Sequence, residues 1–154
     1  MNIFSDTHQK LIKELIKGHV DFILIGGYAV IYYGYKRSTG DMDLWLKPTN
    51  ENKLKLIPVL KKLKFNLKDI QHIEEMDFTT PLTFHFWKEP QRVDCLTKIS
   101  GIDYKEADKN KIIAEFEKMK IPIIHYNHLI LSKITSNRLK DKADVEELQK
   151  INKI

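Results

Sequence analysis

One stretch constrains this chain more than any other, because it sets two short apolar runs beside a pair of glycines and a pair of aspartates. The runs read FILI and MDLWL; Gly26 and Gly27 follow the first, and Asp41 and Asp43 lie at the start of the second. Short apolar runs bounded by glycine or proline are typical of buried strands. On a strand, residues i and i+2 point to the same face. The stretch therefore predicts a buried sheet with two carboxylates on one face.

The chemistry of these four residues points to a phosphate ligand and a metal ion. Two like charges on one strand face are costly unless a cation lies between them. Carboxylate oxygens suit one or two hard cations, here Mg²⁺ or Mn²⁺, when phosphate oxygens complete the coordination shell. Glycines before a helix allow close backbone approach to an anion. Alone, a glycine pair is most often a turn and Asp-x-Asp a solvated strand end; together they predict a triphosphate site.

A third carboxylate, Asp94, lies in the later segment RVDCL. We expect this segment to pair with residues 82–87 in a β-hairpin whose turn is formed by residues 88–91. Nucleotidyl transfer with two metal ions uses one ion to activate the nucleophile and one to stabilise the leaving group. Asp94 is therefore predicted to bind metal or to act as the general base. The alternative is an edge-strand residue that faces water.

The order of the remaining segments predicts an α+β, or mixed α/β, fold. We expect one domain over residues 1–154, with a core at about 1–124, a mixed sheet flanked by helices, and a helical tail at about 125–154. The first predicted helix is capped by residues 5–7 and ends at Gly18. Further predicted helices cover residues 28–33, 49–64, 69–77, 126–137 and 139–151, and further strands cover 112–117 and 121–124.

The helix predicted at 49–64 carries two local expectations. Pro58 lies inside it and is expected to kink or break it, because proline lacks an N–H and its ring clashes with the preceding turn. The spacing of the leucines and isoleucine predicts one apolar face. Its members are Leu54, Ile57, Leu60 and Leu63.

Composition indicates a cytoplasmic protein with no membrane segment. The 154 residues include a single cysteine, Cys95, which excludes an internal disulfide and fits a reducing compartment. No apolar run approaches the ~18 residues of a membrane span, and the N-terminus does not resemble a signal peptide. The net charge of +5 allows a polyanionic partner but is equally that of a lysine-rich solvated surface.

The segments IGGYAV, RSTGDMDLWL and RVDCL together resemble the nucleotidyltransferases of the DNA-polymerase-β-like superfamily. The segment HLILSKITSNRLKDKADVEEL resembles the helical tail of a small bacterial branch, which holds AbiEii-type toxins and minimal nucleotidyltransferases. The likeness runs from about residue 20 to about residue 150. It implies the nucleotidyltransferase fold, an NTP substrate such as ATP, and two Mg²⁺ ions.

The resemblance also implies roles for individual residues. Catalytic and metal-binding residues would be Asp41, Asp43 and Asp94, and nucleotide-binding residues would be Gly26, Gly27, Arg37, Lys133 and Arg138. Arg138, Lys140 and Asp141 match an Arg-x-Lys-Asp turn of the family, and Asp144 matches the aspartate after it. The bland alternative for this tail is a solvated helix with balanced charges. The chain departs from the family at Tyr28, where many relatives have a Ser or Thr whose hydroxyl can bind phosphate.

The resulting hypothesis is an enzyme that transfers an NMP from an NTP to an RNA hydroxyl, as at a tRNA end, or to a protein hydroxyl. Its resemblance also implies a toxin–antitoxin or phage-defence setting with a cognate partner. The alternative is a non-catalytic antitoxin or regulatory module of the same fold that binds a nucleotide or a partner. A third reading, transfer to a small molecule, predicts a deep pocket lined by acids, although the sequence shows no further acidic cluster.

Overall fold

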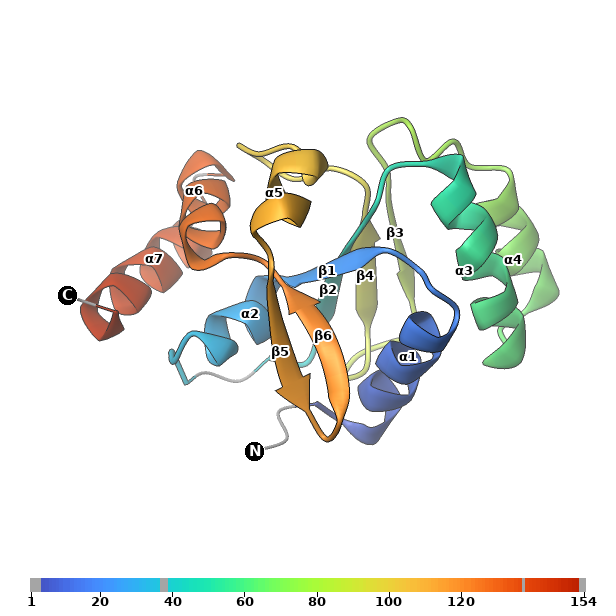
Figure 1. Cartoon of the computed structure of the whole chain (residues 1–154), viewed down its shortest axis with the longest axis horizontal. Coiled ribbons are helices and arrows are strands. Elements are labelled where there is room, and N and C mark those ends of the chain that lie inside the picture. Colours follow the sequence, from blue (N-terminus) through green and yellow to red (C-terminus); the bar gives the residue numbers. More distant parts are fainter. Residues whose placement is uncertain (1–3, 37–38, 137, 153–154) are drawn as a thin grey trace.

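The computed structural model describes residues 4–36, 39–136 and 138–152, which form helices and short strands (Figure 1). Ser5 caps the first helix by accepting a hydrogen bond from the His8 backbone. The elements are α1 (Asp6–Lys17), β1 (Phe22–Ile25), α2 (Gly26–Tyr32), β2 (Met42–Leu46), α3 (Asn50–Lys62), α4 (Leu67–Glu74), β3 (Thr83–Phe86), β4 (Val93–Leu96), α5 (Tyr104–Asn110), β5 (Ile112–Phe116), β6 (Met119–Ile123), α6 (Tyr126–Ser136) and α7 (Leu139–Ile151).

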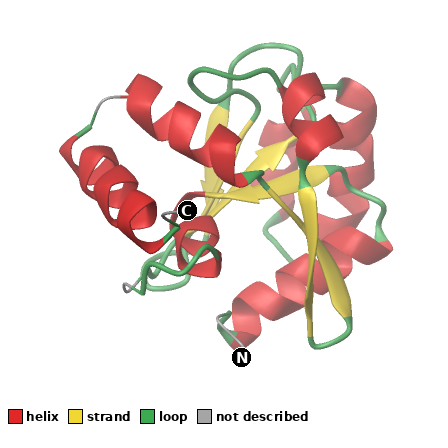
Figure 2. Ribbon diagram, turned by 60° about the vertical axis from the view of Figure 1, so that its left-hand side comes forward, coloured by secondary structure: helices red, strands yellow, loops and turns green. Residues whose placement is uncertain are grey.

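The strands form one six-stranded sheet in the order β3-β4-β2-β1-β6-β5. The central strands β1 and β2 are antiparallel, whereas β2 pairs with β4 and β1 pairs with β6 in parallel. The outer strands β3 and β5 complete antiparallel hairpins with β4 and β6. Helices lie on both sides of this sheet, with α6 and α7 set apart as a pair (Figure 2). The mixed α/β fold class predicted from the sequence is confirmed.

Strand β2 shows how the sequence pattern positions the site. Met42, Leu44 and Leu46 are at most 1% exposed and pack into the core, since alternate residues of a strand share a face. Asp43 therefore points to the opposite face. All four residues of β1 are buried, as expected for a central strand.

Three local predictions were wrong or incomplete. Pro58 does not break α3, which continues to Lys62. Proline has no N–H to donate to the carbonyl of Leu54, four residues earlier, but Leu54 is an exposed residue. Leu54 is 66% exposed, so it is not part of the buried face. Helix α5 was not predicted, although its buried Tyr104 and Ala107 have helical i, i+3 spacing.

Among the described residues, no helix combines the length and apolar character that crossing a bilayer requires.

Candidate active site

A cavity of about 660 Å³ lies between the sheet and the α6–α7 tail, within the range usual for ligand pockets. The structure brings most of the predicted site residues to its walls. These are Gly26, Gly27, Asp41, Asp43, Asp94, Lys133 and Arg138. Arg37, predicted to bind nucleotide, and its neighbour Ser38 lie outside the described residues.

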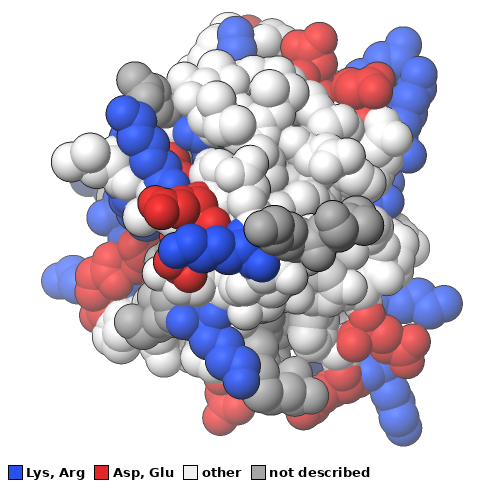
Figure 3. Space-filling view, turned by 90° about the vertical axis from the view of Figure 1, so that its left-hand side faces the viewer, with Lys and Arg blue, Asp and Glu red and all other residues white. Residues whose placement is uncertain are grey.

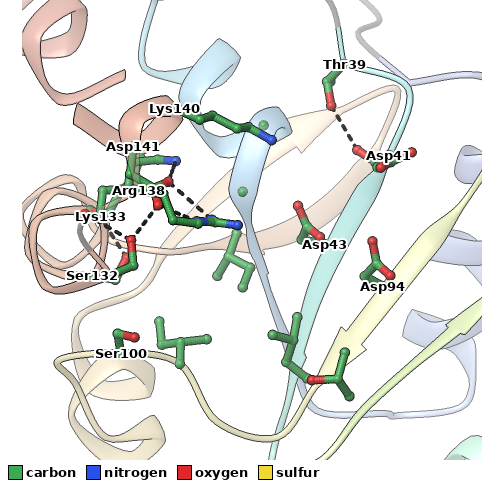
Figure 4. A pocket seen from close by; sticks show the side chains of 18 of the residues that line it. Thr39, Asp41, Asp43, Asp94, Ser100, Ser132, Lys133, Arg138, Lys140 and Asp141 are labelled. Carbon is green, nitrogen blue, oxygen red and sulfur yellow. Dashed lines mark hydrogen bonds and ion pairs between the residues drawn. The ribbon is translucent and has the colours of Figure 1, made fainter. Parts of the chain in front are cut away.

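Strand register places two of the three aspartates next to each other. Asp43 is opposite Asp94 on the parallel strand β4 and opposite Ile25 on the antiparallel strand β1. Their carboxylates lie side by side at the cavity (Figure 4). Burial, followed by the negative charge of Asp94, raises the pKa of Asp43 to about 6. The two carboxylates thus concentrate negative charge at the cavity, and Asp43 has no ion-pair partner among the described residues.

The glycine turn is fitted to Asp43. Gly26 has a φ of +68°, a conformation that L side chains rarely adopt. A Cβ atom at Gly26 would lie 2.1 Å from Oδ2 of Asp43. Both backbone conformation and space therefore require glycine at this position, which brings the turn close to the carboxylate.

Asp41 lies near Glu89, an acid that the sequence analysis did not assign to the site. Its Oδ1 atom is buried, and no N–H or hydroxyl of the described residues donates to it. Glu89 also lines the cavity, and a hydrogen bond to Asp41 together with partial desolvation raises the pKa of Glu89. Since β2 and β4 are parallel, the residues that precede Met42 and Val93 are neighbours. Glu89 could have been found only with this strand pairing in hand.

Arg92 supplies a cation on the β4 side of the cavity. Its Nε donates to Oδ1 of Asp94 over 3.0 Å, and 40% of its side chain is exposed. The hydrogen bond to Asp94, with its charge, raises the pKa of Arg92. One oxygen of Asp94 is thus engaged by the protein.

Lys133 is held by the tail's own carboxylates. Its ammonium lies 3.2 Å from Asp141 and 2.9 Å from Asp144, and all three side chains are at least 92% buried. Burial alone would raise the pKa of Asp141, but hydrogen bonds from Arg138 and Ser136 and the charge of Lys133 lower it to about 2. The solvated-helix alternative does not describe these residues. The part that Lys133 plays in nucleotide binding stays a prediction.

Lys140 and Arg138 are the cations that extend from the tail toward Asp43 (Figure 4). Lys140 forms no ion pair with any described residue, and its charge acts to lower the pKa of Asp43. Arg138 donates through Nε to Asp141 over 2.6 Å, yet 68% of its side chain is exposed. Elsewhere on the face shown in Figure 3, basic and acidic side chains are mixed around a broad uncharged area.

Tyr28, which departs from the family pattern, does not enter the cavity. Its side chain is 4% exposed, its ring packs 4.8 Å from that of Phe4, and its hydroxyl lies 2.9 Å from Nδ1 of His8. The position after the glycine pair therefore serves the core behind the turn.

Comparison with solved structures identifies similar folds at low sequence identity. TM1012 from Thermotoga maritima, a proposed nucleotidyltransferase, is 12% identical, with 94% of this chain and 91% of that chain covered and a TM-score of 0.60. The lincosamide antibiotic adenylyltransferase LnuA, in its lincomycin-bound form, is 14% identical, with coverage of 99% and 100% and a TM-score of 0.59. The antibiotic-resistance factor ANT(2'')-Ia is 12% identical, with coverage of 95% and 85% and a TM-score of 0.59.

These likenesses show that the chain has the nucleotidyltransferase fold. No protein-family model matches the chain, and no curated protein matches it.

Proposed function

We propose that this protein is a nucleotidyltransferase that moves an NMP from an NTP, such as ATP, to an acceptor hydroxyl and releases pyrophosphate. The observation that carries the proposal is the register of β2 and β4, which sets Asp43 beside Asp94 in a cavity that the Gly26 turn also lines. The nucleotidyltransferase fold of the chain supports it. The non-catalytic binding module is the alternative.

The donor set fits Mg²⁺. Asp43 and Asp94 repel each other, and Asp41 has a buried oxygen that no described donor reaches. Among the described residues, no group of three acidic, histidine or cysteine side chains is arranged to hold one metal ion, so at most two of these aspartates would bind the same ion, and phosphate oxygens of the substrate would have to complete its shell. Asp41, Asp43 and Asp94 would hold the ions. When bound, Mg²⁺ or Mn²⁺ neutralises charge on the α-phosphate and the pyrophosphate leaving group.

The protein's own groups have separate tasks in this reaction. Asp94 takes the proton of the acceptor hydroxyl while that oxygen attacks the α-phosphorus. The bond from the α-phosphorus to its bridging oxygen breaks, and pyrophosphate leaves with the electron pair. Arg138 and Lys140 donate charge-assisted hydrogen bonds to phosphate oxygens from the tail side.

For the acceptor, we propose an RNA or protein hydroxyl, in a toxin–antitoxin or phage-defence setting with a cognate partner. A small-molecule alcohol is a second candidate, favoured by a specific observation. Glu89 adds a carboxylate beside Asp41, Asp43 and Asp94 in the cavity, which favours a cationic acceptor. The names of LnuA and ANT(2'')-Ia, an antibiotic adenylyltransferase and an antibiotic-resistance factor, support the same candidate.

The test is transfer of label from each α-labelled NTP with Mg²⁺ to RNA, to lysate protein, or to amine-bearing alcohols such as lincosamides. Wild type is compared with Asp43→Asn and with Asp69→Asn, a matched change at an exposed aspartate of α4. Label in one acceptor class with wild type and Asp69→Asn, but not with Asp43→Asn, supports the proposal and names the acceptor. Absence of label from every class, with folded protein, favours the binding module.

A further inference from the structure

A histidine behind the cavity makes two hydrogen bonds that the proposed chemistry does not use. His8 of α1 is 1% exposed. Its Nδ1 lies 2.9 Å from the hydroxyl of Tyr28, and its Nε2 lies 3.0 Å from the carbonyl oxygen of Gln91. The imidazole thus joins α2 to the turn between β3 and β4.

The partners determine which ring nitrogen carries the proton. A carbonyl oxygen can only accept, so Nε2 must donate to Gln91. In the neutral ring Nδ1 is then the acceptor, and the hydroxyl of Tyr28 donates to it. Burial favours this neutral form by lowering the pKa of His8, although the Gln91 carbonyl and the charge of Asp41 act in the opposite direction.

Gln91 belongs to the turn that carries the acceptor-side carboxylates. Glu89 of this turn lines the cavity, and Arg92 binds Asp94. The turn is fixed to β2 where the Met42 backbone donates to the Arg92 carbonyl over 2.9 Å. The hydrogen bond from His8 attaches the turn to α1 as well.

Tyr28 stands at the other end of the bridge. It directly follows the glycine pair, and its buried ring packs on Phe4. Tyr28 is therefore joined directly to Gly26 and Gly27, which line the cavity at the start of α2.

We infer that His8 is a positioning residue. Its neutral imidazole links Tyr28, behind the glycine turn, to Gln91 on the β3–β4 turn and so fixes the distance between these two turns. An apolar side chain of similar size would fill the same space but would leave the Gln91 carbonyl and the Tyr28 hydroxyl without this partner. The catalytic consequence rests on the proposed function; the bridge itself does not.

Two variants and one control test the bridge. Tyr28→Phe removes the hydroxyl that donates to Nδ1 and that also contacts the Ser5 backbone, and His8→Gln keeps a donor that can reach Gln91. Tyr33→Phe is the matched control, because it removes a tyrosine hydroxyl that donates to the Ile124 carbonyl, away from the β3–β4 turn. Long-range ¹H–¹⁵N spectra of the imidazole report its tautomer, and amide spectra report the surroundings of residues 88–94.

We expect an Nε2–H tautomer, and amide shifts in the 88–94 turn for Tyr28→Phe but not for Tyr33→Phe. In transfer assays Tyr28→Phe should lower kcat about fivefold, the loss expected for one hydrogen bond, and leave KM for the NTP within about twofold. His8→Gln should retain most of the wild-type kcat, and Tyr33→Phe all of it.

An Nδ1–H tautomer, an unmoved turn in Tyr28→Phe, or equal changes of kcat and KM in Tyr28→Phe and Tyr33→Phe would overturn the inference. If wild type transfers no nucleotide, the proposed function fails, and the spectra still decide whether His8 holds the turn.

Discussion

The two walls of the cavity treat charge in opposite ways. On the sheet side, Asp43 has no ion-pair partner among the described residues and lies beside Asp94, which Arg92 engages at one oxygen, and the pKa of Asp43 is raised to about 6. On the tail side, Lys133 is buried between two carboxylates, and the pKa of Asp141 is lowered to about 2. Removing one partner of a balanced buried pair is strongly destabilising, whereas unbalanced buried charges cost stability and are frequent at sites where a ligand supplies the missing charge. The comparison predicts that changes in the tail cluster affect mainly stability and that changes at the sheet aspartates affect mainly the proposed transfer.

The largest expected effect is a loss of stability in the tail, where Lys133 is buried between Asp141 and Asp144. Lys133→Met keeps the length of the side chain but leaves Asp141 and Asp144 with less compensation in a buried site. Removing one partner of a buried ion pair costs about 3–5 kcal/mol. We therefore expect the free energy of unfolding, measured with urea, to fall by this amount.

Lys142→Met is the control for Lys133→Met, because Lys142 is exposed on α7. It should leave the urea midpoint unchanged. An unchanged midpoint in Lys133→Met as well would mean that the cluster does not stabilise the tail.

A change at Asp43, on the sheet side, should lower activity and not stability. Asp43→Asn is expected to lower transfer activity by roughly 10²- to 10³-fold, because it removes a carboxylate that faces the developing charge and its metal ion. Its thermal midpoint should not fall, since the variant removes repulsion with Asp94. A stable variant that retains full activity would contradict the site.

The pH dependence of stability should separate the two walls in metal-free buffer. Asp141, with a folded pKa of about 2 against 3.8, contributes stability that is present above about pH 4 and lost as the pH falls toward 2. Asp43, with a folded pKa of about 6, has the opposite sign: its contribution is complete below about pH 4 and lost as the pH rises through 6.

Urea unfolding of wild type and Asp43→Asn at pH 4 and pH 7 measures the second effect. Over this interval wild type should lose more stability than the variant, by on the order of 2 kcal/mol. Equal losses in the two proteins would show that ionisation of Asp43 does not lower the free energy of unfolding.

The sequence predicted most of the helices and strands, and it predicted that Asp43 and Asp94 belong to one site. The strand Met42–Leu46 and the helix Leu139–Ile151 have the predicted bounds, because their apolar periodicity is local. The cavity also brings together Asp43 and Asp94, which the motif had joined. Such features depend on short segments or on a known pattern.

The remaining features depend on contacts between distant segments. Glu89 meets Asp41 only because β2 and β4 pair in parallel, and His8 reaches Gln91 across 83 positions of the sequence. The pairing of Lys133 with Asp141 and Asp144 likewise follows from the packing of α6 on α7. Local patterns carry no information on these distances.

The smallest expected effect concerns the cation that stands between the two walls. Lys140 has no ion-pair partner among the described residues and extends toward Asp43, so its charge is available to a ligand. Lys140→Met should raise KM for the NTP about tenfold, as expected for loss of one charged hydrogen bond, while the urea midpoint stays that of wild type.

Lys142→Met, on the same helix, serves again as the control and should change neither quantity. If Lys133→Met, refolded in stabilising salt, raised KM more than Lys140→Met does, Lys133 would be the phosphate ligand after all. The tail would then have to release its buried lysine when nucleotide binds, and its charges would be balanced only in the absence of substrate.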